Sequence, residues 1–515
     1  MRTIIKGHFP FFILLVIIAF FRFYMLFVSQ THVHSDEAII GLMAKHISEG
    51  LFFPVYMYGQ VYNAGAVIEA CFAALSFILF GVSPVALKGC IVIISLVTLT
   101  VFYFIVARFW NKKIALLSSL LFSFFPSLLK WHFQVRGYSP YFLMIVLLWG
   151  LFLSIKNNPR PSGKKIFVFG LVTGFSLWIL ELILSVCGFM WLILFFKRRI
   201  FSKGCLLAVS GFLTGYFPCI LFNLTNHFVN WKMVFMDKVS LPLESFFMIS
   251  TWGKILFREM PKFFGTDTVL WYYPEINMEG IVGCCFFLVS LLVGMIQIFR
   301  NDQKNEHREY FFLILLLIAC FIPYISTSFR VPGYFLGSAV FLSVLTGSVC
   351  YELLEKNNLL NKIAFFSLLL IFMGLSLYNI VKISSENIIE TLTLDRKGAA
   401  MLGRFPGKDI SETMSYLKQN GIEETWTTPS FVYPLIFESQ EKLKACSAIF
   451  GSNFDCYPEG IPSKVTPPRS PATYIVESES PYYSAIIHHY KNKKDLLRIS
   501  RFGSLTVVST ITKSP

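Results

Sequence analysis

The chain has 515 residues, of which 55% are hydrophobic and only 15% are charged. Soluble proteins carry about 25% charged residues, so this composition excludes an ordinary soluble protein and indicates a membrane protein. The net charge of +15 is concentrated: 18 of the 45 Lys and Arg residues, but only 5 of the 30 Asp and Glu residues, lie in six short segments between apolar runs. The six segments are Met1–His8, Arg108–Lys113, Lys156–Lys165, Lys197–Lys203, Arg300–Glu309 and Tyr351–Lys362. Such clusters are typical of cytoplasmic loops, and we therefore expect no nucleic-acid partner.

Apolar runs close to the ~20 residues that a helix needs to cross the hydrocarbon recur along the chain. We predict eleven spans, at residues 9–28, 85–107, 114–130, 138–155, 166–181, 182–197, 204–223, 280–299, 310–328, 331–350 and 363–383. The N-terminus then lies in the cytoplasm and the C-terminal part lies outside. The predicted fold class is a polytopic α-helical protein of the inner (plasma) membrane, with a transmembrane domain at residues 1–383.

Residues 63–81 decide this topology, because they are apolar enough to resemble a span. Counting them as one would place sixteen Lys and Arg residues from five later loops on the outer side. We therefore predict a helix that lies on the outer surface of the membrane, with Asn63 and Glu69 turned to water. It belongs to a first outer loop at residues 29–83, and a second large outer loop, rich in aromatic residues, covers 224–279.

The first outer loop contains adjacent acids, Asp36 and Glu37, just before a predicted helix at Ala38–Glu49. One interpretation is structural, because Ser35 can cap the helix and acids suit the positive end of a helix dipole. The other is that one carboxylate is a general base that takes a proton from a hydroxyl nucleophile. The histidines of this loop do not have a convincing metal-ligand spacing. The sequence therefore indicates no cofactor, and a divalent metal ion is left as an open alternative that no motif supports.

Three arginines are predicted near the outer ends of spans: Arg22, Arg136 and Arg330. Each alone is typical of an anchor at the lipid headgroups, and Arg22 can also snorkel to the interface. Together, at one membrane face, they predict a site for a phosphate. Between the two predicted helices of the first outer loop, Tyr58, Gln60 and Tyr62 form either an interfacial aromatic turn or the wall of a sugar site.

Residues 384–515 have nearly balanced charge and no spanning run, and we predict a small extracytoplasmic α/β domain. Asp409–Asn420 is expected to form an amphipathic helix, and Thr473–Val476 and Ser504–Thr510 are expected to form strands. This domain contains two of the eleven cysteines, Cys446 and Cys456. An oxidising compartment predicts a disulfide between them, and two unrelated thiols are the alternative.

The pattern of the first loop resembles a known group of enzymes. It comprises Ser35-Asp36-Glu37-Ala38 after a first span, Tyr58-Gly59-Gln60, Tyr62, a second apolar helix, Phe80-Gly81-Val82-Ser83 and a span that ends in Arg108. It resembles the dolichyl-phosphate-mannose protein mannosyltransferases, the bacterial glycosyltransferase family 39 and the lipid A aminoarabinose transferases, all of the GT-C superfamily. The resemblance covers about residues 1–350, and residues 411–457 are similar to the outer domain of bacterial relatives.

The resemblance implies a glycosyltransferase with a polyprenyl-phosphate-linked sugar donor, inversion at the anomeric carbon and an acidic base in the first loop. That role would fall to Asp36, with Glu37 beside it. The acceptor would be a glycan, lipid or protein of the cell envelope. Eukaryotic members carry His-Pro-Pro-Leu where this chain has residues 62–66. This difference bears on the identity of the acceptor more than on that of the donor. The acids are adjacent rather than Asp-x-Asp, so a metal requirement does not carry over.

Two other functions fit a protein with many spans. A transporter or lipid flippase would have similar helices. The long first loop and the C-terminal domain are larger than a carrier needs, and the sequence shows no pair of matching broken helices in two halves. An O-antigen polymerase or ligase would also use lipid-linked sugars outside the membrane. Its key residues would lie in the later outer loop at residues 224–279.

Overall fold

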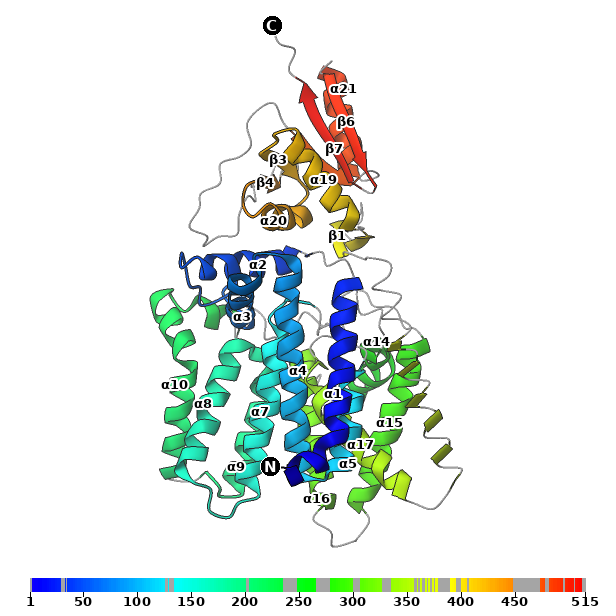
Figure 1. Cartoon of the computed structure of the whole chain (residues 1–515). Coiled ribbons are helices and arrows are strands. Elements are labelled where there is room, and N and C mark those ends of the chain that lie inside the picture. The colour runs from blue at the N-terminus through cyan, green and yellow to red at the C-terminus, as the bar shows by residue number, and fades with distance from the viewer. Residues whose placement is uncertain are drawn as a thin grey trace. The chain divides into compact units, whose positions relative to one another are not determined.

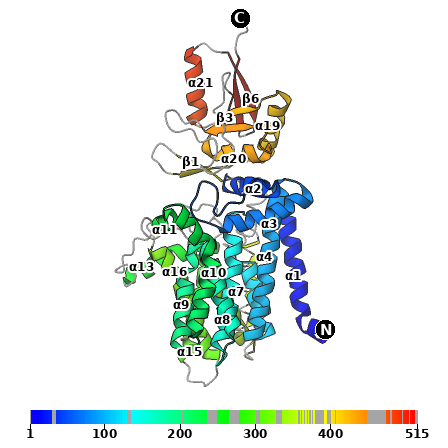
Figure 2. The same cartoon turned by 90° about the vertical axis from the view of Figure 1, so that its left-hand side faces the viewer.

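The computed structural model of the protein is mostly helical (Figures 1 and 2). It describes residues 2–28, 33, 35–125, 128, 134–200, 203–234, 248–264, 278–299, 306–326, 335–355, scattered positions between 359 and 377, 390–394, 400–404, 407–447, 473–477, 481–493, 496–503 and 505–511. The chain divides into two compact units. The first unit comprises Met1–Phe23, Val61–Ile68 and Ile91–Val381, and the second comprises Tyr24–Gln60, Glu69–Cys90 and Lys382–Pro515.

Helices make up the first unit. They are α1 (Arg2–Val28) and α4 (Pro84–Phe109), which both continue into the second unit, and α5 (Lys112–Ser123), α7 (Tyr138–Lys156), α8 (Gly163–Ile179), α9 (Leu184–Phe196), α10 (Lys203–Thr225), α11 (Val229–Lys232), α13 (Ile249–Lys254), α14 (Met260–Phe264), α15 (Met278–Phe299), α16 (Glu306–Ser326) and α17 (Ser338–Glu355). A single 3-10 turn, η1 (Glu181–Ile183), separates α8 from α9. This break falls at Glu181, where we predict the turn between two spans.

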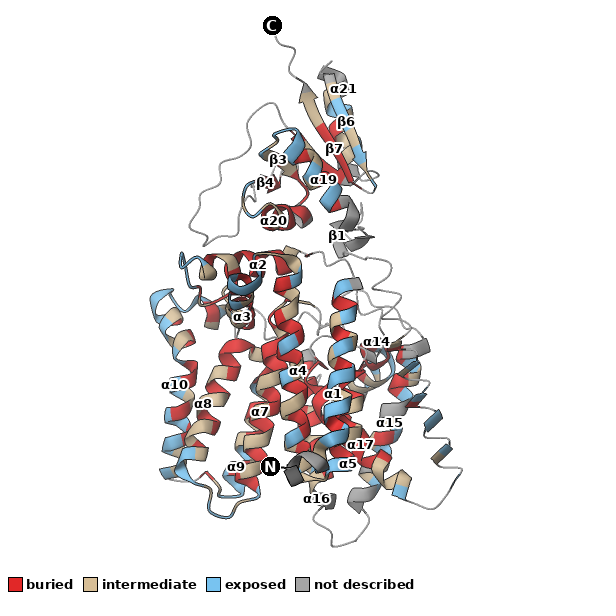
Figure 3. Ribbon diagram, in the orientation of Figure 1, coloured by how far each residue is buried: buried red, intermediate tan, exposed pale blue. Residues whose placement is uncertain are grey.

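Within the described residues, five helices are long and apolar enough to cross a membrane: α1, α4, α7, α10 and α17. Shorter apolar helices lie at several of the other predicted spans, so the count of eleven remains a prediction. Figure 3 shows exposed residues along α1 and α10, and many of these are large and hydrophobic. An apolar helix face that no protein covers suits contact with lipid tails.

Close glycine contacts join α8 to α10, which lie side by side in Figures 1 and 2. Gly170 and Gly174 on α8 face the backbone of α10, and Gly211 and Gly215 on α10 face the backbone of α8. A Cβ atom at any of the four would overlap backbone atoms of the facing helix. Each pair has the small-xxx-small spacing that lets membrane helices approach closely. Such close packing stabilises helix association in lipid, where there is no hydrophobic driving force between helices.

The helix predicted to lie on the membrane surface is α3 (Gly65–Phe80), which is apolar but too short to count among the five. Its predicted orientation is wrong: Glu69 is fully buried, whereas Phe72, Leu75 and Leu79 are exposed. Asn63, just before α3, is half-buried and donates a hydrogen bond to the Arg136 carbonyl oxygen at 3.2 Å. The apolar residues face outward because the polar ones are used within the protein.

The second unit contains the helix α2 (Ser35–Ser48) and most of α3. Its C-terminal part has the strands β1 (Glu390–Leu394), β2 (Ala400–Arg404), β3 (Glu424–Thr427), β4 (Lys444–Ser447), β5 (Thr473–Glu477), β6 (Leu496–Phe502) and β7 (Leu505–Ile511), and the helices α19 (Gly407–Gln419), α20 (Pro429–Glu438) and α21 (Pro481–Lys493). The predicted helix at 409–420 and the strands at 473–476 and 504–510 are thus confirmed. The domain boundary at residue 383 remains a prediction.

A mixed sheet organises this C-terminal part, with strand order β4-β3-β5-β7-β6. Strand β3 pairs in parallel with β4 and β5, whereas β7 pairs antiparallel with β5 and β6. Val476, Ile486 and Val508 form a buried cluster between α21 and the sheet. The parallel pair β3 and β4 is connected through α20, and this crossover helix also contacts α2.

Candidate functional site

The two acids of the first loop lie in the first turn of α2, which begins at Ser35 rather than at the predicted Ala38. Their surroundings differ. Glu37 is 2% exposed, and its Oε2 lies 3.1 Å from Nζ of Lys88. Asp36 is half-buried. The carboxylate of Glu37 is therefore used in a buried ion pair, whereas Asp36 is more accessible at the start of the helix.

Lys88 was not among the residues predicted for the site. It lies in the second turn of α4, and its side chain is mostly buried. A lysine near the start of an apolar span is the signal that could have identified it, because a charge in such a place needs a partner. An unpaired carboxylate at the buried position of Glu37 would destabilise the fold, and the ion pair with Lys88 offsets this cost.

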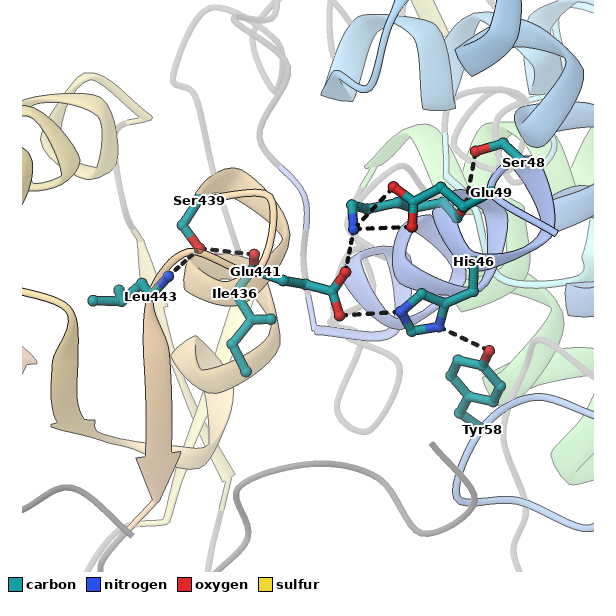
Figure 4. A network of polar contacts seen from close by, with 9 residues as sticks. His46, Ser48, Glu49, Tyr58, Ile436, Ser439, Glu441 and Leu443 are labelled. Atoms are coloured by element: carbon teal, nitrogen blue, oxygen red, sulfur yellow. Dashed lines mark hydrogen bonds and ion pairs between the residues drawn. The ribbon is translucent and has the colours of Figure 1, made fainter. Parts of the chain in front are cut away.

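The C-terminal half of α2 carries a second polar group (Figure 4). Nδ1 of His46 lies 3.0 Å from the Tyr58 hydroxyl, and Nε2 of His46 lies 3.0 Å from Oε1 of Glu441. Lys45 forms an ion pair with the other oxygen of Glu441, and its Nζ is 3.2 Å from Oε1 of Glu49. Burial opposes the charged form of Lys45, but the hydrogen bonds and charges of Glu441 and Glu49 raise its pKa overall.

Tyr58 and Gln60 are placed by a tight turn in which the Gln60 N–H donates to the Met57 carbonyl oxygen at 3.0 Å. Gly59 has φ 72 there, a backbone conformation that glycine adopts without strain. Tyr58 is 4% exposed, and burial, together with the charge of Glu441, raises the pKa of its hydroxyl. No described residue hydrogen-bonds the buried Oε1 of Gln60.

Arg22 is fully buried in α1, and its Nη1 donates to Oγ of Ser95 on α4 at 2.7 Å. Among the described residues, no hydrogen-bond partner satisfies its Nε or Nη2. The structure thus places the side chain against protein rather than in the snorkelling position. A buried guanidinium with unsatisfied N–H groups is costly, and an anion would satisfy them.

Arg136 lies in a junction of the first unit where two segments touch through their backbones. Gly137, with φ 84, precedes α7, and a Cβ atom there would overlap Asn63 and Ala66. Asn230 of α11 donates to the Val61 carbonyl oxygen at 2.6 Å and so links α11 to the same segment. Tyr62 and Arg136 are both half-buried in this junction.

Asn230 belongs to a buried amide pair that the sequence analysis missed. Asn223 of α10 is fully buried, and its Nδ2 lies 3.3 Å from Oδ1 of Asn230. Asn223 also accepts a hydrogen bond from the Trp231 N–H at 3.1 Å. Asparagines among the aromatic residues of 222–232 were the available signal.

Two predicted residues, Arg330 and Cys456, lie outside the residues that the structure describes. Cys446 on β4 is disulfide-bonded. Its pairing with Cys456 remains a prediction. No group of three or more His, Cys, Asp or Glu side chains suited to a metal occurs among the described residues.

Comparison with solved structures finds two crystal structures of ArnT from Cupriavidus metallidurans. The one bound to undecaprenyl phosphate has a TM-score of 0.63 at 12% identity, over 98% of this chain and 98% of that chain. The apo form has a TM-score of 0.62 at 12% identity, over 97% of each chain. The oligosaccharyltransferase AglB from Archaeoglobus fulgidus, in complex with an inhibitory peptide and a dolichol-phosphate, has a TM-score of 0.48 at 12% identity, over 86% of this chain and 64% of that chain.

No family model and no curated protein matches the sequence. At 12% identity the likeness to ArnT shows the fold alone. The chain therefore shares the overall fold of ArnT, in line with the resemblance seen in the first loop.

Proposed function

We propose that this protein is a membrane glycosyltransferase that takes a sugar from a polyprenyl-phosphate donor and transfers it to an acceptor of the cell envelope. The observation that supports this most strongly is the fold, which is shared over 98% of both chains with a protein solved with undecaprenyl phosphate. A fold does not by itself imply an activity, so the chemistry must come from the residues of this chain.

In the proposed reaction a hydroxyl of the acceptor attacks the anomeric carbon from the side opposite the phosphate. The bond between that carbon and the phosphate oxygen breaks, polyprenyl phosphate leaves with the electron pair, and the anomeric configuration is inverted. Asp36 takes the proton of the hydroxyl as general base. The ion pair between Glu37 and Lys88 supports this assignment, because it leaves Asp36 as the more accessible carboxylate of the two.

The leaving phosphate gains negative charge as the bond breaks, and cations held in place stabilise it. Arg22 is suited to this role because it is buried and has two N–H positions that no described residue satisfies. Arg136 and Arg330 are the other candidates, and we propose that at least one of the three contacts the phosphate. Tyr58, Gln60 and Tyr62 are the proposed contacts for the sugar.

We place the reaction on the outer face of the inner membrane, with eleven spans and residues 384–515 outside. The disulfide bond of Cys446 supports an oxidising compartment for this part of the chain. Nine other cysteines are free thiols, and we propose Cys456 as the partner.

The proposal is tested with the full-length protein in lipid nanodiscs, a lipid extract that contains polyprenyl-phosphate sugars, and an envelope extract that supplies the acceptor hydroxyls. Wild-type protein should release free undecaprenyl phosphate, measured by mass spectrometry. Asp36→Asn keeps the shape but removes the basic oxygen, so release should fall by roughly 10²–10⁴ while undecaprenyl phosphate still binds. Full activity of Asp36→Asn together with an inactive Glu37→Gln would reverse the two roles. Activity in both variants would place the base elsewhere.

A flippase would move the lipid-linked sugar across the bilayer without breaking its bond to phosphate. Intact donor with no free polyprenyl phosphate, in the presence of envelope acceptors, would therefore favour the flippase. For an O-antigen polymerase or ligase, substitutions within 224–279 would abolish transfer and those of Asp36 and Glu37 would not.

A further inference from the structure

We propose that the segment Phe437–Glu441, which joins the end of α20 to the turn after it, is a positioning element that holds α2 and thereby Asp36. We call this segment the α20 turn. The proposal rests on the proposed function, because it gives Asp36 a catalytic role. It assigns the C-terminal part of the chain a task in the transfer step itself.

The first contact of the α20 turn is electrostatic (Figure 4). Glu441 directs one carboxylate oxygen to Lys45 and the other to Nε2 of His46. Only 19% of the Glu441 side chain is exposed, and only 14% and 5% of the Lys45 and His46 side chains. Ion pairs this well shielded from water are screened less by salt than surface pairs. Removal of Glu441 should therefore destabilise the contact with α2.

The second contact is steric and lies one helical turn earlier on α2. Gly41 faces the ring of Phe437, and a Cβ atom at Gly41 would lie 2.7 Å from Cδ2 and 2.9 Å from Cζ of that ring. Residues 37, 41 and 45 are spaced by four, so Glu37, Gly41 and Lys45 share one face of α2. This face carries the second acid of the site at one end and the contact with Glu441 at the other.

The backbone of the α20 turn is strained where it presents Glu441. Gln440 has φ 53 and Glu441 has φ 65, a left-handed conformation that residues with a side chain rarely adopt. Ser439 supports this geometry, because its hydroxyl donates to the Ile436 carbonyl oxygen at 2.9 Å and accepts from the Leu443 N–H at 3.1 Å. Strained backbone conformations that surrounding hydrogen bonds stabilise occur often at functional sites, where they fix the direction of a side chain.

The same turn contacts the elements that follow α2. The Phe437 ring lies 6.2 Å from that of Phe77 on α3, and Nε2 of Gln440 donates to the Val82 carbonyl oxygen at 3.3 Å. Glu438 is near Lys88, the partner of Glu37, and the charge of Lys88 acts on its pKa. The α20 turn thus holds α2, α3 and the start of α4 together.

A short helix needs such support, because α2 has 14 residues and isolated helices of this length are marginal in water. Lys45 is nine residues from Asp36, which is about 14 Å along a helix, so Glu441 acts at a distance from the acceptor hydroxyl. Glu441 is therefore a positioning residue, and its effect on the reaction passes through the placement of Asp36.

The test uses full-length protein in nanodiscs and two readouts: hydrogen exchange of the α2 amides and the kinetics of undecaprenyl phosphate release. Glu441→Gln should speed exchange across α2 by on the order of tenfold. It should lower kcat by roughly 10- to 100-fold while KM for the donor changes by less than about twofold. Glu424→Gln is the matched control, because it removes a carboxylate of β3 that pairs with the half-exposed Lys444 of β4, and both readouts should stay at wild-type values.

A second set of variants keeps the proposal testable if Glu441→Gln folds poorly. Gly41→Ala should raise exchange in α2 and lower kcat, because the added methyl collides with Phe437. Trimming the ring in Gly41→Ala/Phe437→Leu should restore both. Gly188→Ala is the control, since a Cβ atom there meets nothing within 4 Å.

Unchanged α2 exchange in Glu441→Gln would overturn the proposal, and so would faster exchange with unchanged kcat. Failure of the proposed function gives a different result. Wild-type protein would then release no undecaprenyl phosphate, while the exchange measurement would still show whether the α20 turn holds α2.

Discussion

Arg22 and Glu37 are both buried ionisable side chains, but their charges are satisfied to different degrees. Glu37 has Lys88 at 3.1 Å, whereas Arg22 uses one N–H on Ser95, and no described residue satisfies its Nε or Nη2. Removing one partner of a buried pair leaves a charge that is costly to keep. From this contrast we propose a supporting role for Glu37 and the binding of an anion by Arg22.

Substitution of Arg22 tests the phosphate contact. Arg22→Lys keeps a positive charge but loses the planar fork of N–H donors, so it should bind undecaprenyl phosphate more weakly than wild type and more strongly than Arg22→Ala. We expect a loss of about 1.5–3 kcal/mol, or roughly 10- to 100-fold in Kd, for Arg22→Ala. Native mass spectrometry of the protein with undecaprenyl phosphate measures this. Unchanged affinity in Arg22→Ala, Arg136→Ala and Arg330→Ala would refute the phosphate site.

Glu438 gives a prediction about pH. Burial raises the pKa of Glu438 to about 7, and the positive charge of Lys88, itself paired with Glu37, opposes this shift. Because the folded pKa exceeds the unfolded value of about 4.3, the stabilising contribution is full below pH ~4.3 and is lost as the pH rises through 7. Glu438→Gln mimics the protonated group, so its Tm should match wild type near pH 4 and exceed it near pH 8.

The control for this prediction is Glu412→Gln, which removes a carboxylate at an exposed position on α19. Thermal scans in nanodiscs at both pH values suffice. A Glu438→Gln variant that loses stability relative to wild type as the pH rises would contradict the assigned direction of the pKa.

Within the described part of the chain, α8 and α10 pack backbone to backbone, and glycine accounts for it. An alanine methyl at Gly211 would overlap backbone atoms of α8, and forcing extra volume into a packed contact typically costs about 1–3 kcal/mol. Gly211→Ala should therefore lower Tm. Gly188→Ala on α9 has open space and should keep or raise Tm, because alanine favours a helix over glycine by about 1 kcal/mol. Equal Tm values for the two variants would contradict the packing account.

Elements were predictable where a local pattern determines them. The helix that carries Asp36 and Glu37 follows from local signals, and so does the break at Glu181. Orientation was not predictable for α3, because Glu69 finds its place inside the protein and no periodicity shows what surrounds a helix. The glycine pairs of α8 and α10 were readable from spacing, but only the structure shows which faces meet.

The contacts of α2 with the C-terminal part could not be predicted, because Lys45 and Glu441 are 396 residues apart. Nothing in the local sequence links them, and the left-handed backbone at Gln440 and Glu441 has no glycine to signal it. The helical membrane fold of about residues 1–350 was predictable from the first loop, because the acidic pair, the turn at Gly59 and the span pattern occur together. The likeness to ArnT over 98% of both chains confirms a helical membrane fold, whereas the count of eleven spans and the bounds of the C-terminal domain remain predictions.

Topology is a prediction about the whole molecule. A reporter fused after Lys165 should report the cytoplasm, because eleven spans place the 156–165 segment, with its four basic residues, inside. The same fusion after Lys442 should report the outside. A signal from outside the membrane at Lys165 would show that residues 63–81 cross it and would overturn the eleven-span arrangement.

The central claim is that the protein removes a sugar from a polyprenyl phosphate, and the lipids of the living cell test it most directly. Polyprenyl-phosphate sugars should be measured by mass spectrometry in a strain that lacks the gene and carries either the wild-type gene or Asp36→Asn. With Asp36→Asn the lipid-linked sugar should accumulate and one sugar should disappear from the envelope, whereas the wild-type gene should reverse both changes. Equal amounts of every polyprenyl-phosphate sugar in the two strains would contradict the account.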